Sequence, residues 1–68
     1  MMQTVFVNKE ALEIADHTSL QQVIEKVLTE IDGIAIALNE NIIPKDDWQT
    51  TILNDKDDII IIGAVAGG

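Results

Sequence analysis

The sequence TSLQQVIEKVLTEIDG, residues 18–33, contains the longest helical pattern in the chain. Its large apolar residues recur at intervals of three and four, which places them along one face of an α-helix; they are Leu20, Val23, Ile24, Val27, Leu28 and Ile31. Thr18 and Gln21 have the spacing of a capping box, and Gly33 suits the left-handed residue that often ends a helix. We therefore predict one amphipathic helix that begins after Thr18 and ends before Gly33.

Extended segments flank this helix on both sides. Residues 4–7 and 11–14 have strand patterns, and Asn8-Lys9 between them suits a tight turn because Asn tolerates a positive φ. We predict a β-hairpin here. After the helix we predict strands at residues 34–38, 51–53 and 59–62, a short extended segment at residues 42–43 and one helical turn at residues 45–48.

The order of these elements predicts the fold class. A single amphipathic helix covers only one face of a sheet, so we expect an α+β fold with a mixed sheet and one main helix. A hairpin, a crossover helix and further strands around it are typical of the β-grasp, or ubiquitin-like, roll. We expect one domain at residues 1–62 and a flexible C-terminal Gly-Gly tail at residues 63–68.

The composition excludes several classes of function. The net charge of −8 opposes binding to nucleic acid or anionic membranes, and favours either a partner with a basic surface or solubility alone. The absence of cysteine excludes disulfides, thiolate catalysis and cysteine-based metal sites. The N-terminus lacks a signal-peptide pattern, and no apolar run approaches the roughly 20 residues that span a bilayer. We therefore expect a cytoplasmic protein.

Residues suited to internal chemistry are few. His17 has no companion ligand or nucleophile at useful spacing, so a surface or capping role is expected. The acidic pairs Asp46-Asp47 and Asp57-Asp58 do not converge in regular structure, which favours turn and capping roles over a metal site. Trp48 is expected to close one end of the core with its indole N–H at the surface, and a binding role is the alternative. No catalytic residue and no metal site is predicted.

The strands also predict an apolar surface on the face without a helix. Residues 59–62 are all isoleucine, and alternation must send one pair of them to that face. We expect Phe6, Ile60 and Ile62 there, because the valines on either side of Phe6 make a better-matched core pair. Such a patch, continuing into Val65 and Ala66, predicts a surface that docks partner proteins. Loops that fold over this face are the alternative.

The C-terminal sequence GAVAGG, residues 63–68, is the strongest candidate for chemistry. Gly67 and Gly68 lack Cβ atoms, so this end of the chain can enter a narrow channel, and six residues extend about 20 Å. These properties suit a C-terminal carboxylate that is itself the reacting group. An ordinary frayed terminus is the alternative. Because a carboxylate is a poor electrophile, another protein would have to activate it with ATP.

Several segments together match a known pattern. They are IALNE at residues 36–40, IIPK at 42–45, Trp48, Leu53, Asp55, Asp57, the isoleucine-rich strand and AGG at 66–68. With these residues the chain resembles the ThiS family, the sulfur carriers of thiamine biosynthesis, over essentially its whole length. One departure is Lys56, where the family usually has glycine between the two aspartates. We therefore expect Asn54 or Lys56 to adopt a left-handed conformation.

The resemblance implies a mechanism in which this chain is a protein substrate rather than an enzyme, with no bound cofactor. A ubiquitin-activating-type adenylyltransferase would adenylate the carboxylate of Gly68 with ATP and Mg²⁺. A sulfur relay from a cysteine desulfurase would then convert it to a thiocarboxylate, and thiazole synthase would take the sulfur. Gly67 and Gly68 would form the modified C-terminus. A sulfur carrier for molybdopterin or another pathway, and a ubiquitin-like binding module, are the alternatives.

Overall fold

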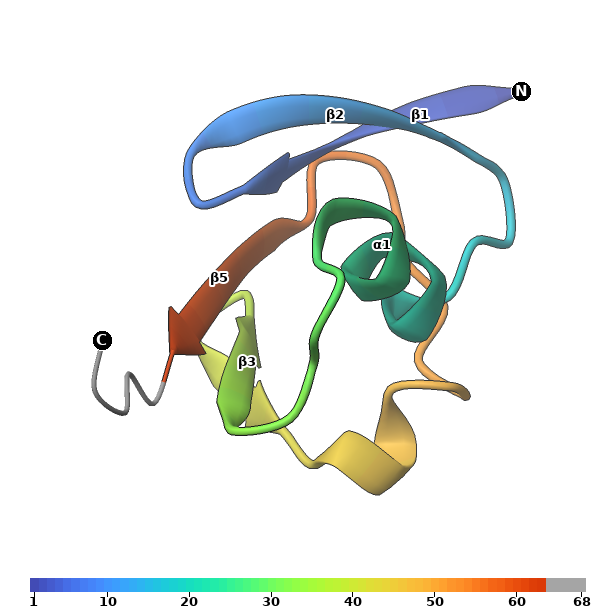
Figure 1. Cartoon of the computed structure of the whole chain (residues 1–68). Helices are drawn as coiled ribbons and strands as arrows, with labels where there is room; N and C mark the ends of the chain where they lie inside the picture. The colour runs from blue at the N-terminus through green and yellow to red at the C-terminus, as the bar shows by residue number, and fades with distance from the viewer. Residues whose placement is uncertain (64–68) are drawn as a thin grey trace.

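The computed structural model describes residues 1–63 and contains, within them, a five-stranded sheet, one α-helix and one 3₁₀ helix (Figure 1). The strands are β1 (Met2–Val7), β2 (Glu10–Ala15), β3 (Ile34–Leu38), β4 (Asn41–Ile43) and β5 (Asp58–Gly63). The helices are α1 (Leu20–Val27) and η1 (Lys45–Asp47). Over this part of the chain, no helix is long and apolar enough to cross a membrane.

The sheet has the strand order β2-β1-β5-β3-β4, so the last strand lies at its centre. β1 and β5 are parallel and pair Phe6 with Asp58, whereas the other three pairs of strands are antiparallel. α1 lies across one face of this sheet (Figure 1). The predicted α+β fold, a β-grasp roll with a mixed sheet and one main helix, is therefore confirmed.

Both hairpins turn through an asparagine followed by a charged residue. Asn8 and Lys9 have φ values of 51° and 74°, and Asn39 and Glu40 have φ values of 50° and 73°. Two consecutive residues with positive φ form the type I′ turn, whose twist matches that of the flanking strands. The predicted turn at Asn8-Lys9 is confirmed, and the turn at residues 39–40 has the same form.

The helix is shorter than predicted and is capped one residue later. Ser19, not Thr18, is the N-cap: its hydroxyl accepts from the backbone N–H of Gln22, and the Gln22 side chain accepts from the Ser19 N–H. Thr18 is unsuited to this role because its hydroxyl donates to the carbonyl of Ala15 at 2.7 Å. The predicted capping box of Thr18 and Gln21 was therefore wrong by one position.

The C-terminal end of the helix also differs from the prediction. α1 ends at Val27, and Leu28 is already extended, with φ −128° and ψ 141°. Gly33 does have a positive φ of 77°, but it belongs to the turn that enters β3. Residues 28–33 form the connection from α1 to the first residue of β3. Leu28 and Ile31 still pack against the core from this connection.

The core lies between α1 and the sheet. Its buried members come from four strands, the helix and the long connection to β5: Val5, Ile14, Leu20, Val23, Ile24, Ile36, Trp48, Leu53 and Ile59. Trp48 closes this cluster as predicted and is 1% exposed. The indole N–H was expected at the surface. It instead donates to the carbonyl of Ile43 at 2.8 Å. A buried indole N–H needs such a partner because leaving it unpaired would cost free energy.

The predicted strand at residues 51–53 does not form. This segment makes only an isolated bridge, between Ile52 and Ser19. Its backbone pairs with the entrance to the helix, because Leu20 donates to Thr51 and Leu53 donates to Thr18. The prediction was wrong because a tertiary contact outside the sheet satisfies the hydrogen bonds of these residues.

Candidate docking face and C-terminal strand

One face of the sheet has no helix over it, and apolar side chains collect there. In β1 and β5, Val5 and Ile59 face the core and are fully buried, so Phe6 and Ile60 point to the opposite face. The same alternation applies along β3 and β4. We call this surface the open face; it consists of Phe6, Ala35, Ala37, Ile42, Ile60 and Ile62.

The strand register arranges the isoleucines around two alanines. Ala37 pairs with Ile60 on one side and with Ile42 on the other, and Ala35 pairs with Ile62. Opposed residues in antiparallel strands have Cβ atoms about 5 Å apart, so these side chains are neighbours. Ile42 is 61% exposed and Ile62 is 46% exposed. Exposed apolar side chains that are contiguous in this way are typical of an interaction surface.

The structure therefore places Phe6, Ile60 and Ile62 on the face that was expected from the sequence. Phe6 and Ile60 are half-buried, and none of the three packs against the core cluster. Within residues 1–63, no helix covers these residues (Figure 1). Their docking role stays a prediction. Val65, Ala66, Gly67 and Gly68 lie outside the described residues, and Gly63 is the last residue of β5.

Two asparagine side chains hold the central strand that leads to the C-terminal segment. Asn8 accepts from the N–H of Ile61 at 2.9 Å, which extends the pairing of β5 beyond the end of β1. Asn39 accepts from the N–H of Asp58, also at 2.9 Å, and its amide group donates to Asp57 at 3.0 Å. β5 is thus fixed by hairpin asparagines on both sides. The C-terminal segment starts from a firmly held strand next to the open face.

The turn before β5 contains Lys56, the residue that stands where the family that this chain resembles usually has glycine. A left-handed conformation was expected at Asn54 or Lys56. Lys56 has a φ of 71°, so this lysine takes the left-handed position. Asp57 is buried and accepts from the backbone N–H of Asn54 at 2.7 Å, while Asp55 accepts from the N–H of Thr4 at 2.8 Å. These aspartates stabilise the turn, as predicted for Asp57.

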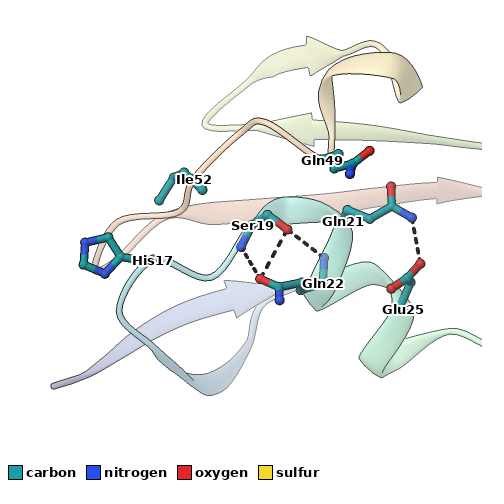
Figure 2. A pocket seen from close by; sticks show the side chains of 7 residues that line it. All are labelled: His17, Ser19, Gln21, Gln22, Glu25, Gln49 and Ile52. Carbon is teal, nitrogen blue, oxygen red and sulfur yellow. Dashed lines mark hydrogen bonds between the residues drawn. The ribbon is translucent and has the colours of Figure 1, made fainter.

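A hollow on the described surface lies elsewhere, at the N-terminal end of α1 (Figure 2). It has a volume of about 600 Å³ and is lined by His17, Ser19, Gln21, Gln22, Glu25, Gln49 and Ile52. The Ser19 hydroxyl is engaged with Gln22, and Gln21 donates to Glu25 at 2.9 Å. His17 is exposed, as predicted, and its ring is turned away from Ser19 in Figure 2. These contacts stabilise the helix end and do not activate the serine.

Three members of the open face were missed by the sequence analysis. Ala35 and Ala37 lie in the strand predicted at residues 34–38, and Ile42 lies in the extended segment predicted at residues 42–43, but neither segment was assigned to a face of the sheet. Alternation places Ile42 and Ile43 on opposite faces, and in the structure Ile43 packs against the core. Which of the two isoleucines faces the core depends on the register with β3, and that register follows from the tight turn at residues 39–40.

Comparisons with known proteins agree with this arrangement. The family model described as "ThiS family" matches residues 3–68. A sulfur carrier protein ThiS from Escherichia coli (strain K12) is 31% identical over 67 residues, which cover 98% of this chain and 100% of that protein. A crystal structure of a thiamine biosynthesis protein (ThiS) from Geobacter metallireducens has a TM-score of 0.82 and covers 97% of this chain and 100% of that one. At 14% identity, this last likeness is evidence for the fold alone.

Proposed function

We propose, because this chain belongs to the ThiS family, that it is a sulfur carrier of thiamine biosynthesis whose reacting group is the carboxylate of Gly68. The observation that carries the proposal is that the family match extends through Gly67 and Gly68. The name of the Escherichia coli relative, a sulfur carrier, agrees with it. On this proposal the chain is a substrate of partner enzymes rather than a catalyst.

The proposed chemistry has three steps. The Gly68 carboxylate attacks the α-phosphorus of ATP on an adenylyltransferase of the ubiquitin-activating type, with Mg²⁺ on the phosphates, and pyrophosphate leaves. In the second step, the terminal sulfur of a cysteine persulfide on the desulfurase relay attacks the acyl carbon and AMP leaves, which gives an acyl disulfide. A thiol of a partner protein then attacks the relay cysteine sulfur of this disulfide; the S–S bond breaks, the thiocarboxylate leaves, and the two cysteines are oxidised to a disulfide. The product is a thiocarboxylate, which thiazole synthase uses as its sulfur source. A chain without cysteine suits this role, because no internal thiol competes for the activated acyl group.

The open face is proposed as the surface that docks the adenylyltransferase. It is apolar, has no covering helix within residues 1–63, and adjoins the end of β5. The net charge of −8 would speed encounter with a partner that has a basic surface around its apolar contact. Docking the folded domain while the C-terminal segment reaches the ATP site would separate recognition from chemistry.

The test is incubation with the adenylyltransferase, ATP, Mg²⁺ and a sulfur source, followed by intact mass spectrometry. One oxygen atom should be replaced by sulfur, and fragmentation should locate the change at Gly68. The chain that ends at Gly67 should fold equally well and remain unmodified. Thiocarboxylation of that truncated chain would contradict the assigned site, and an unchanged mass of the full chain with an active enzyme would contradict the carrier function.

Carriers for other pathways share this first chemistry, so a second experiment separates them. The purified thiocarboxylate should support thiazole formation when it is added to thiazole synthase with its other substrates. It should not replace the small subunit of molybdopterin synthase in molybdopterin formation. The reverse result would leave the sulfur-carrier chemistry intact and assign it to another pathway.

A further inference from the structure

Strand β2 forms one edge of the sheet, and part of its backbone has no hydrogen-bond partner among residues 1–63. β1 pairs with one side of β2, and no other described strand lies beyond its outer side (Figure 1). The N–H of Asp16 donates to Met1 on the β1 side. Backbone N–H groups point to alternate sides of a strand. The N–H groups of Ala11, Glu13 and Ala15 therefore point away from β1. The carbonyl of Ala15 accepts from Thr18, so Ala11 and Glu13 present the free edge.

Two hollows lie along this edge, between β2 and α1. One has a volume of about 240 Å³ and its lining includes Ile14, Val23 and Lys26. The other has a volume of about 340 Å³ and its lining includes Leu12 and Val27. Along β2 they are two to four residues apart, which matches the two-residue repeat of side chains on one face of a strand.

The exposure of Val27 indicates that side chains of residues 1–63 leave the space between β2 and α1 partly open. The position of Val27 on the apolar side of the helix predicts a core residue, yet it is 39% exposed and lies outside the core cluster. Val27 lines the second of the two hollows, beside Leu12 of β2. An additional strand beside β2 would cover this side chain.

The charges favour a basic partner over a second copy of this chain. β2 contains Glu10 and Glu13 and no basic residue, and Glu13 lies on the sheet face away from α1. A lysine or arginine opposite Glu13 would form a cross-strand ion pair. Two copies of the chain would each bring a net charge of −8 to the contact, which opposes their association.

We propose that the β2 edge binds an extended segment of a partner protein by strand addition. The segment alternates apolar residues, which enter the two hollows beside α1, with basic residues, which lie next to Glu13. Its backbone pairs with Ala11 and Glu13. This binding site uses the free edge of β2 and the hollows beside α1, and not the residues that define the open face or the C-terminal carboxylate, so it stands or fails independently of the proposed sulfur transfer.

The test uses the full chain labelled with ¹⁵N and the peptide acetyl-Lys-Val-Lys-Val-Lys-Val-Lys-amide as the probe. Titration should shift the amide resonances of β2 and of residues 23–28, and should slow hydrogen exchange at Ala11 and Glu13. The same peptide with every backbone amide methylated should not bind, because it has no N–H groups to donate. Shifts confined to the open face, or no shifts at millimolar peptide, would overturn the proposal.

Matched variants separate backbone pairing from charge. Glu13→Ala removes only the ion pair and should weaken binding a fewfold, whereas Glu13→Pro also removes the outward N–H and should weaken it by about tenfold or more. Val27→Lys leaves the edge intact and should also weaken binding, while Ile52→Lys, at a site 48% exposed, should not. Wild-type binding by both Glu13→Pro and Val27→Lys would refute the site. Amide shifts at Ala11 and Glu13 that depend on protein concentration without peptide would show that a second copy pairs there instead.

Discussion

At the scale of single residues, several residues other than glycine have a positive φ, which most side chains disfavour. Asn8 and Asn39 tolerate a positive φ and use it, because each also accepts from a backbone N–H of β5. Lys56 has a positive φ of 71° without such a compensation from its side chain. The surrounding aspartate contacts keep the turn closed despite the strain at this lysine.

Replacing Lys56 with glycine should therefore stabilise the protein. An L-residue in the left-handed region costs about 1–2 kcal/mol, and the extra entropy that glycine loses offsets part of the gain. We expect Lys56→Gly to raise the free energy of unfolding by about 0.5–1 kcal/mol. Urea unfolding followed by the fluorescence of Trp48, the only tryptophan, measures this. Lys56→Ala, which keeps the Cβ atom, should change stability much less; an equal gain would show that the lysine side chain, and not the backbone, is responsible.

At the scale of elements, contacts from outside the helix determine where it begins. Thr18 and Ser19 are both suitable capping residues in the sequence. The bridge between Ser19 and Ile52 fixes Ser19 in the extended conformation that an N-cap requires, and Thr18 is engaged with Ala15. A local pattern therefore predicted the helix and missed its boundary.

The capping box leads to a prediction that distinguishes the two possible boundaries. Ser19→Ala should lower the free energy of unfolding by about 1 kcal/mol, because the N–H of Gln22 loses its acceptor. Gln21→Ala removes only a hydrogen bond to Glu25 on the helix surface and should cost about 0.5 kcal/mol or less. The same unfolding measurement compares both variants. A larger loss for Gln21→Ala would support the box of Thr18 and Gln21 that the sequence predicts.

At the scale of the whole molecule, one helix covers one face of the sheet and leaves the other without a helix within residues 1–63. The face under α1 holds the buried core, whereas the open face retains exposed isoleucines. A small domain has few apolar residues to spare, so leaving several of them exposed is costly unless the surface is used. We therefore expect the fold to tolerate substitutions on the open face.

Substitution on the open face should accordingly affect docking and spare folding. Ile62→Glu should change the free energy of unfolding by about 0.5 kcal/mol or less and slow thiocarboxylation by about tenfold or more. Ile52→Glu is the matched control, because Ile52 is 48% exposed and Ile62 is 46% exposed, but Ile52 lies beside α1. Initial rates of thiocarboxylate formation measure the effect. Equal rates for the two variants would exclude the open face as the docking surface.

The sequence alone was sufficient for the fold class, the single helix, the hairpin at residues 8–9 and the assignment of Phe6, Ile60 and Ile62 to one face. These features depend on the spacing of apolar residues and on local turn preferences, both of which can be read along the chain. Tertiary structure decided four other features. They are the helix boundaries, the absence of a strand at residues 51–53, the hydrogen bond of the Trp48 indole and the position of Ile42 on the open face. Each of these is set by a partner distant in the chain or by strand register, because a backbone or indole group pairs with whichever donor or acceptor the fold brings to it.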